Sequence, residues 1–347
     1  MPDHIHVEIN TSTILRTVLI ILFFVFLYIL KDVLIIFLFA LIIASAISPF
    51  ANWLDEKGFP RLLGVLLLFL VVLALVIGVL SLIIPYVSQD INQLVSTLPQ
   101  FVAKVSTSLE KVQQGSPQYL DFLSEIQNIL QSFSDYLQQS SQSIIGLVIS
   151  IFGGAMSAIA ILIISFYLSV TKKGIENFLG SVVPEKYENY AINLWKRAEL
   201  KVGLWLQGQL LIGLIMGLIV YVGLSLIGIK FALILGFLVA IFEIIPMVGP
   251  VLAAIPAIFL AFLQSPALGL WVIVFYVVVQ QLESHVLVPV VLGRTIGLNP
   301  VVVIIALLIG QQLAGIPGMI LSVPVATIIV EMMDDFAKHK DSKRQSS

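Results

Sequence analysis

Cysteine is absent from this sequence of 347 residues, and charged residues and histidine are scarce. The lack of cysteine excludes disulfides, thiolate metal sites and cysteine nucleophiles. Only one histidine, His285, lies away from the polar ends of the chain, so no histidine-based metal centre is expected. Charged residues make up 11% of the sequence and hydrophobic residues 59%, whereas a soluble domain carries about 25% charged residues. With a mean hydropathy of +1.08, the composition predicts an all-α polytopic membrane protein.

Motifs of several functional classes are also missing from the sequence. It has no HExxH or GxSxG motif and no pair of carboxylates beside a histidine, so we expect no enzyme activity, metal or cofactor. A P-loop, which would indicate an ATP-driven pump, is absent, and so is a run of like charges that could line a channel. The net charge of −2 predicts no nucleic-acid partner. These absences favour a secondary transporter, with a non-transporting membrane scaffold as an alternative.

The apolar runs are separated by polar segments of contrasting charge. Basic residues gather at 171–201 and after residue 336, whereas residues 86–142 hold two basic and five acidic residues. Because basic loops stay in the cytoplasm, we expect the N-terminus, residues 171–201 and the C-terminus inside and residues 86–142 outside. The first apolar run, 14–30, is followed at once by a second, which favours a retained helix over a cleaved signal peptide.

The polar segment 86–142 carries apolar residues at helical spacing on both sides of a turn at 115–117. It therefore predicts a helical hairpin, in which Pro99 suits the first turn of a new helix. Its apolar stripe could pack on itself or against a neighbouring protomer. The predicted organisation is transmembrane helices 1–3 in 1–85, an extracytoplasmic helical insert in 86–142, transmembrane helix 4 and a cytoplasmic amphipathic helix in 143–201, a core with interrupted or re-entrant helices in 202–336, and a disordered basic cytoplasmic tail in 337–347.

The sequence FEIIPMVGPVLAAIP, residues 242–256, places a carboxylate and three prolines in the most apolar part of the chain. The flanking runs, 231–243 and 251–263, would each form ~20 Å of helix, too short for a hydrocarbon core of ~30 Å. Backbone that has lost its helical hydrogen bonds is tolerated at this depth only inside protein or beside water. The segment 231–263 therefore predicts a re-entrant hairpin in which Glu243 faces a solute path. Glycine and proline also interrupt 298–333, although charge alone does not decide whether either segment is re-entrant or fully spanning.

Residues inside or beside these interruptions are the candidates for a solute or ion path. They are Glu243, Pro246, Gly249, Pro250, Gln280, Glu283, His285, Arg294, Gln311 and Gln312. Each group has a structural alternative, since Glu243 could lie at the outer interface, residues 280–285 could form a polar cap and Arg294 could anchor the chain in the cytoplasm. Gln207 and Gln209 are expected to join helices by hydrogen bonds.

Two stretches carry a family resemblance. They are WLQGQLLIGLIMGLIVYVGLSLIGIKFALILGFLVAIFEIIPMVGPVLAAIPA, residues 205–257, and HVLVPVVLGRTIGLNPVVVIIALLIGQQLAGIPGMILSVPVA, residues 285–326. With the IPxxGP element of Ile245, Pro246, Gly249 and Pro250, the chain resembles the autoinducer-2 exporter family, also called PerM, over essentially its whole length.

The resemblance implies a multi-pass protein of the bacterial inner membrane with about eight hydrophobic helical segments, assembled as a homo-oligomer such as a pentamer. It implies export of the quorum-sensing signal autoinducer-2 or a similar small polar solute, and the alternative is sodium(lithium)/proton antiport. The expected partners are therefore a small polar solute, or a monovalent cation or proton, and the lipid bilayer.

Overall fold

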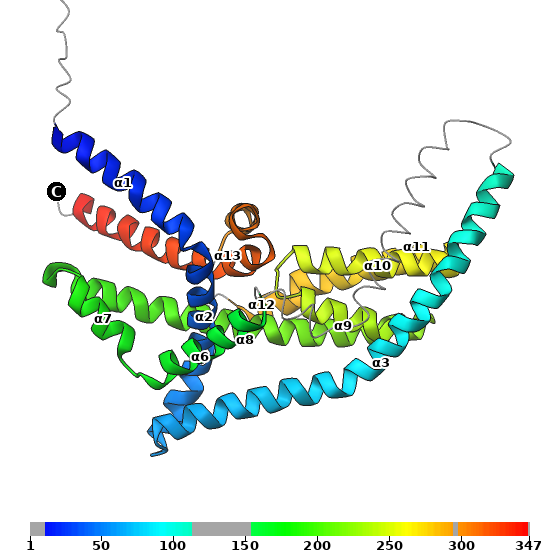
Figure 1. Ribbon diagram of the computed structural model, residues 1–347, viewed down its shortest axis with the longest axis horizontal. Coiled ribbons are helices and arrows are strands. Elements are labelled where there is room, and N and C mark those ends of the chain that lie inside the picture. Colours follow the sequence, from blue (N-terminus) through cyan, green and yellow to red (C-terminus); the bar gives the residue numbers. More distant parts are fainter. Residues whose placement is uncertain (1–10, 113–153, 294–297, 346–347) are drawn as a thin grey trace, which may run out of the picture.

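The structure, a computed structural model, describes residues 11–112, 154–293 and 298–345. Within these ranges all regular secondary structure is helical, which confirms the predicted all-α fold (Figure 1). Five of the described helices are long and apolar enough to cross a membrane, and there are up to six spans if α6 and α7, bent by 84°, are taken together. The helices are α1 (Thr11–Ile29), α2 (Lys31–Glu56), α3 (Arg61–Val112), α6 (Ala155–Val170), α7 (Gly174–Val182), α8 (Glu185–Ile227), α9 (Ala232–Phe242), α10 (Val248–Gln264), α11 (Pro266–Leu282), η1 (Glu283–Leu287), α12 (Val288–Val291) and α13 (Pro300–Gln345).

Helix α3 is one helix of 52 residues that bends as it runs past α8 and α9 (Figure 1). It continues through Pro99, so the predicted start of a new helix at this proline is wrong. A proline removes one intrahelical hydrogen bond and bends the helix, but the turns on either side can still form. The expected boundary at 85/86 lies inside α3. The second arm of the predicted hairpin lies outside the described residues.

Helix α8 is a continuous helix of 43 residues that unites the predicted amphipathic helix with the following apolar run. The expected division between residues 201 and 202 falls inside it, because no helix breaker separates the two parts. The helix ends at Gly228, whose φ of 83° is the left-handed conformation that favours glycine after a helix. Near its other end, Arg197 and Lys201 form ion pairs with Glu331 of α13, and the Arg197 Nε to Glu331 Oε1 distance is 2.8 Å.

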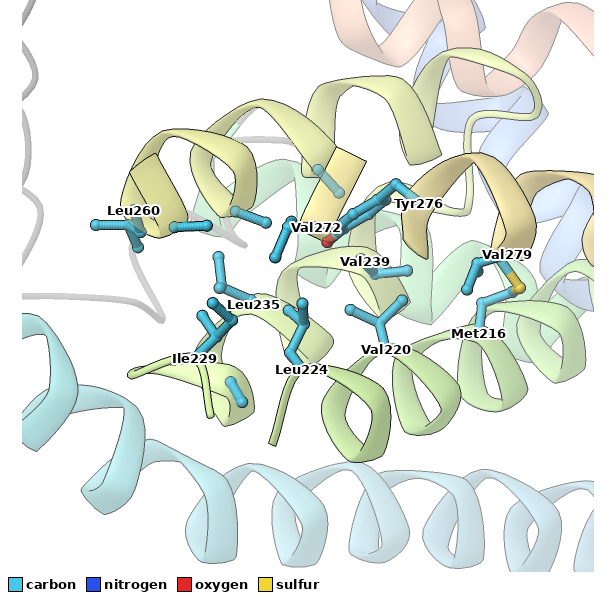
Figure 2. Packing of buried hydrophobic residues seen from close by; sticks show 14 of the residues in the cluster. Met216, Val220, Leu224, Ile229, Leu235, Val239, Leu260, Val272, Tyr276 and Val279 are labelled. Carbon is cyan, nitrogen blue, oxygen red and sulfur yellow. The ribbon is translucent and has the colours of Figure 1, made fainter. Parts of the chain in front are cut away.

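Buried apolar side chains form two clusters along α8. The first joins the middle of α8 to α2, α6 and α13, and its largest fully buried member is Trp205. The second joins the other half of α8 to α9, α10 and α11, where Met216, Val220, Val239 and Val272 face one another (Figure 2). Ile245, which lies between α9 and α10, belongs to the first cluster. The connection from α9 to α10 is therefore placed at the junction of the two clusters.

Helices α8 and α9 approach closely because glycines line their contact. A Cβ added to Gly217 would lie 2.8 Å from both the carbonyl oxygen of Gly236 and the Cβ of Ala240. A Cβ added to Gly213 would lie 2.8 Å from the carbonyl oxygen of Ala240. Small residues at a helix contact let backbones approach and gain van der Waals contact, which stabilises helix pairs in lipid.

Helix α13 contains a second interruption at Ala314 and Gly315, both of which have non-helical backbone angles. The chain reverses there, and the backbones of Gly310 and Gly318 touch. The part after the reversal continues as helix to Gln345. This differs from the disordered tail expected at 337–347, since residues 337–345 extend the preceding helix.

Candidate functional site

The candidate site lies at the interruption between α9 and α10, residues 243–247. Glu243 ends α9, and a short turn leads to Met247, which has a φ of 66°. A positive φ is strained for a residue with a side chain and is common at functional sites. Gly249 packs its α-carbon against the carbonyl oxygen of Phe242, where a Cβ would not fit. Pro250 occupies the first turn of α10, where a missing N–H costs little. These residues interrupt the helix and keep the end of α9 in contact with the start of α10.

Glu243 is buried at the contact with α8. Its side chain is 1% exposed, and neither carboxylate oxygen accepts a hydrogen bond from any donor among the described residues. A Cβ added to Gly213 would lie 3.3 Å from the Cβ of Glu243, so this glycine leaves room for the carboxylate. The side-chain amide of Gln209, itself buried, donates to the main-chain carbonyl of Glu243. This bond satisfies a carbonyl that the end of α9 leaves without an intrahelical partner.

Glu283 reaches the same place from α11. It is 5% exposed, and its Oε2 accepts a hydrogen bond of 2.9 Å from Nε2 of Gln280. It begins η1, a single π-helical turn that precedes Pro289. A proline clashes with the carbonyl four residues before it, and widening the preceding turn relieves this clash. Such turns inside helices often mark functional sites.

The carboxyl groups of Glu243 and Glu283 lie close enough for each to act on the charge of the other. An ionised carboxylate only accepts hydrogen bonds, so two of them have no proton to share and repel each other. A single proton between them supplies the missing donor, and a monovalent cation would neutralise the pair in the same way. Burying a neutral polar group without a hydrogen bond costs on the order of 2–7 kcal/mol. Burying a negative charge without a partner costs several kcal/mol per ion even after the protein relaxes, so two unpaired carboxylates are strongly unfavourable. A buried carboxyl pair of this kind is therefore a candidate site for one proton or one monovalent cation.

The remaining predicted residues divide between this site and the surface. Gln280, Gly249 and Pro250 lie at the carboxyl pair or in the turn that carries it. His285 is exposed and bonds through Nδ1 to the carbonyl of Gln281 at 3.1 Å, away from the pair. Gln311 and Gln312 are exposed on α13, and Pro246 is partly buried in the turn. Arg294 lies outside the described residues.

Two buried polar residues near the site are not among the predicted candidates. Gln209 joins helices as expected, but the carbonyl that it binds is that of Glu243 itself. Tyr276 is 8% exposed, and its hydroxyl points into the second apolar cluster without a partner among the described residues (Figure 2). Its spacing of four and seven residues from Gln280 and Glu283 could have placed it on their helix face. In the described ranges no group of three or more potential metal ligands occurs.

A helical membrane protein with an interrupted core helix and a buried carboxyl pair belongs to the broad class of polytopic transport proteins. The sequence profile of the AI-2E family transporter family matches residues 17–338, and the chain therefore belongs to this family of transport proteins. The chain is 30% identical over 283 residues to the putative transport protein YueF of Bacillus subtilis (strain 168), covering 79% of this chain and 76% of YueF. It is 24% identical over 308 residues to the putative transport protein YhhT of Escherichia coli (strain K12), covering 86% and 83%. The AI-2 transport protein TqsA of the same strain is 36% identical over 123 residues, or 34% of each chain.

Proposed function

We propose that this protein is a secondary transporter in which the Glu243–Glu283 pair carries the coupling proton or monovalent cation. The observation that supports this most strongly is the pair itself, since both carboxyl groups are buried, they act on each other, and Glu243 has no donor among the described residues. A structural ion pair would have a basic partner. A site that needs one positive charge and can release it is what ion-coupled transport requires.

Two cargoes fit this proposal. The first is a small polar solute such as autoinducer-2, which the similarity to the AI-2 transport protein TqsA supports. The second is exchange of sodium or lithium for protons, which the carboxyl pair favours because it could bind either ion in turn. We also infer that the protein forms a homo-oligomer in a bacterial inner membrane. Both termini then lie in the cytoplasm and residues 86–142 lie outside.

The proposal is tested by flux measurements on the full chain in proteoliposomes. A proton gradient should drive movement of sodium or of autoinducer-2, each assayed separately. Glu243→Gln keeps the shape and hydrogen-bonding reach of the side chain but cannot gain or lose a proton. We expect this variant to reduce gradient-driven flux at least about tenfold, equivalent to about 1.4 kcal/mol.

The matched control is Glu56→Gln, which neutralises an exposed carboxylate at the end of α2. It should leave the flux unchanged. If Glu243→Gln and Glu283→Gln both insert normally and retain the gradient-driven flux of the natural sequence, the pair does not carry the coupling ion. Flux of neither cargo under any gradient would favour the scaffold alternative.

A further inference from the structure

A separate cavity of about 500 Å³ lies where α2, α6, α7, α8 and the start of α3 meet. Its polar lining contains four basic side chains, two acidic ones and several hydroxyl groups. The basic residues are Arg61, Lys172, Lys173 and Lys196, and the acidic ones are Glu176 and Glu199. This volume is within the range of about 300–1,000 Å³ that is typical of small-molecule sites. The carboxyl pair and its neighbours do not line the cavity.

Two of the four basic side chains that line the cavity form ion pairs with acidic residues. Lys172 pairs with Asp55 at 2.6 Å, and Lys196 pairs with Glu176 at 3.5 Å. Lys173 forms no ion pair with any described residue. Of the charged side chains that line the cavity, Arg61 and Lys173 then stand against Glu199 alone, so a net positive charge remains at the cavity.

Arg61 is held in place by neutral groups. Its Nε donates to the carbonyl oxygens of Ser169 and Val170, at 3.0 and 3.1 Å. Its Nη1 donates to Oδ1 of Asn52 at 2.7 Å, so its hydrogen bonds leave its charge in place. The Asp55 carboxylate, which is paired with Lys172, also attracts it from nearby but forms no ion pair with it. A guanidinium fixed in this way has N–H groups left to bind the oxygens of an anion.

The first turn of α7 adds a second feature that suits an anion. Its N-cap residue, Lys173, provides no capping hydrogen bond, and Gly174, Ile175 and Glu176 of the first turn line the cavity. The N–H of Gly174 donates to the carbonyl oxygen of Thr171 at 3.2 Å, which leaves the N–H groups of Ile175 and Glu176 for a ligand. The first N–H groups of a helix have no intrahelical acceptor, and they bind phosphate where no side chain caps them.

The surroundings of the cavity suit a membrane surface. Its wall also contains apolar side chains, among them Leu168, Ile175 and Trp195. Helix α7 turns by 84° from α6, which lays it across the direction of that span, and it exposes Phe178 and Val182. Helices with exposed apolar residues beside basic ones lie in the interface between lipid and water. Basic pockets between membrane helices on the cytoplasmic side bind anionic head groups.

We propose that this cavity binds the phosphate head group of an anionic phospholipid, with Arg61, Lys173 and the first turn of α7 as the groups that contact the phosphate. The head group occupies the polar part of the cavity, and the first carbons of its acyl chains contact the apolar wall. This site is independent of the carboxyl pair and of the cargo, because none of its residues takes part in the proposed ion binding.

The test compares the full chain in nanodiscs that contain phosphatidylcholine alone or increasing fractions of phosphatidylglycerol. The thermal unfolding midpoint should rise with phosphatidylglycerol and reach a plateau. In Lys173→Gln the fraction needed for half of this rise should increase about fivefold, which corresponds to about 1 kcal/mol for one basic residue near an anionic surface. Lys173→Gln removes no ion pair among the described residues, so we expect normal folding.

The matched control is Lys186→Gln on α8. Its ammonium group lies 5.4 Å from the centroid of the Tyr187 ring and does not line the cavity. This variant should respond to phosphatidylglycerol as the natural sequence does. An equal loss in both variants would overturn the site in favour of general surface charge. Stabilisation by inorganic phosphate or glycerol 3-phosphate in phosphatidylcholine nanodiscs, without an effect of phosphatidylglycerol, would overturn the lipid as the source of the phosphate.

Discussion

The interruption between α9 and α10 and the interruption inside α13 look alike in sequence but differ in what they bury. Both combine glycine and proline with polar residues in an apolar run, and both bring backbone atoms into contact through a glycine. At the first, Glu243 is 1% exposed and lies against Glu283. At the second, Gln311 and Gln312 are exposed.

The difference shows that a broken helix does not by itself bury a polar group. The first interruption lies at the junction of two apolar clusters, so a polar group there can only face other protein groups. The second lies beside exposed apolar residues such as Leu308 and Leu313, and its reversal is held by the contact of Gly310 with Gly318. Burial of a charged group, rather than loss of helix, distinguishes the functional candidate from the structural turn.

The largest effect that would test this comparison is on transport. If the two carboxyl groups act as one site, Glu243→Gln and Glu283→Gln combined should lose no more flux than the more damaging single variant, since effects within one unit are not additive. Gln311→Ala with Gln312→Ala should change flux less than about twofold, or about 0.4 kcal/mol. Proteoliposome flux measures all four variants. Independent, multiplying losses from the two carboxyl variants would separate the groups, and a large loss at the glutamines would make the second interruption a site as well.

A smaller effect, on stability and on the pH dependence of transport, is expected at the glycines whose backbones make the close contacts of the two interruptions. Gly249→Ala and Gly318→Ala both place a methyl group against a backbone carbonyl, so each should lower the free energy of unfolding by about 1–3 kcal/mol. Only Gly249→Ala should also change the pH dependence of transport, because it displaces the turn that carries Glu243. Unfolding in detergent and flux against pH measure the two effects. Gly78→Ala, at a half-buried helical position where an added Cβ would meet no atom within 4 Å, serves as the control and should not destabilise. A normal pH profile in Gly249→Ala would show that the turn does not position the carboxylate.

The smallest effect is expected at Tyr276. Because its hydroxyl has no partner among the described residues, Tyr276→Phe should change the free energy of unfolding by less than about 1 kcal/mol and can be stabilising. Transport should stay unchanged, since the hydroxyl has no contact with the carboxyl pair. Tyr221→Phe, on the more exposed face of α8, is the matched control. A clear loss of flux in Tyr276→Phe alone would extend the site along α11.

The sequence was sufficient to predict the fold class and to single out Glu243, which is buried, but it was not sufficient to predict that Glu283 lies beside it. Long apolar runs can form only helices in lipid, and a carboxylate inside such a run is costly enough to be noticed. The partner of Glu243 is 40 residues further along the chain. Their meeting depends on the reversal into α10 and on the packing of α11, which local patterns do not encode.

The sequence also did not predict which of the neighbouring polar residues are buried or which groups they contact. Glu283 and His285 belong to one polar segment in the sequence, 280–285, yet the structure buries the first and exposes the second. Gln209 had the pattern of a residue that joins helices, and only the packing of α8 against α9 identifies Glu243 as the residue to which it is joined. These outcomes follow from tertiary contacts, which decide which face of a helix is buried.

Because α8 is continuous, it connects α13 mechanically to the end of α9. Arg197, which is tied to Glu331 and Asp335 of α13, and Gln209, which is tied to the main chain of Glu243, belong to the same unbroken helix. They are separated by 12 residues, or ~18 Å of helix. A rigid rod cannot tilt at one point without moving at the other. A tilt of α8 that strains its ion pairs to α13 therefore also shifts the carbonyl that Gln209 binds, and with it the end of α9 at Glu243.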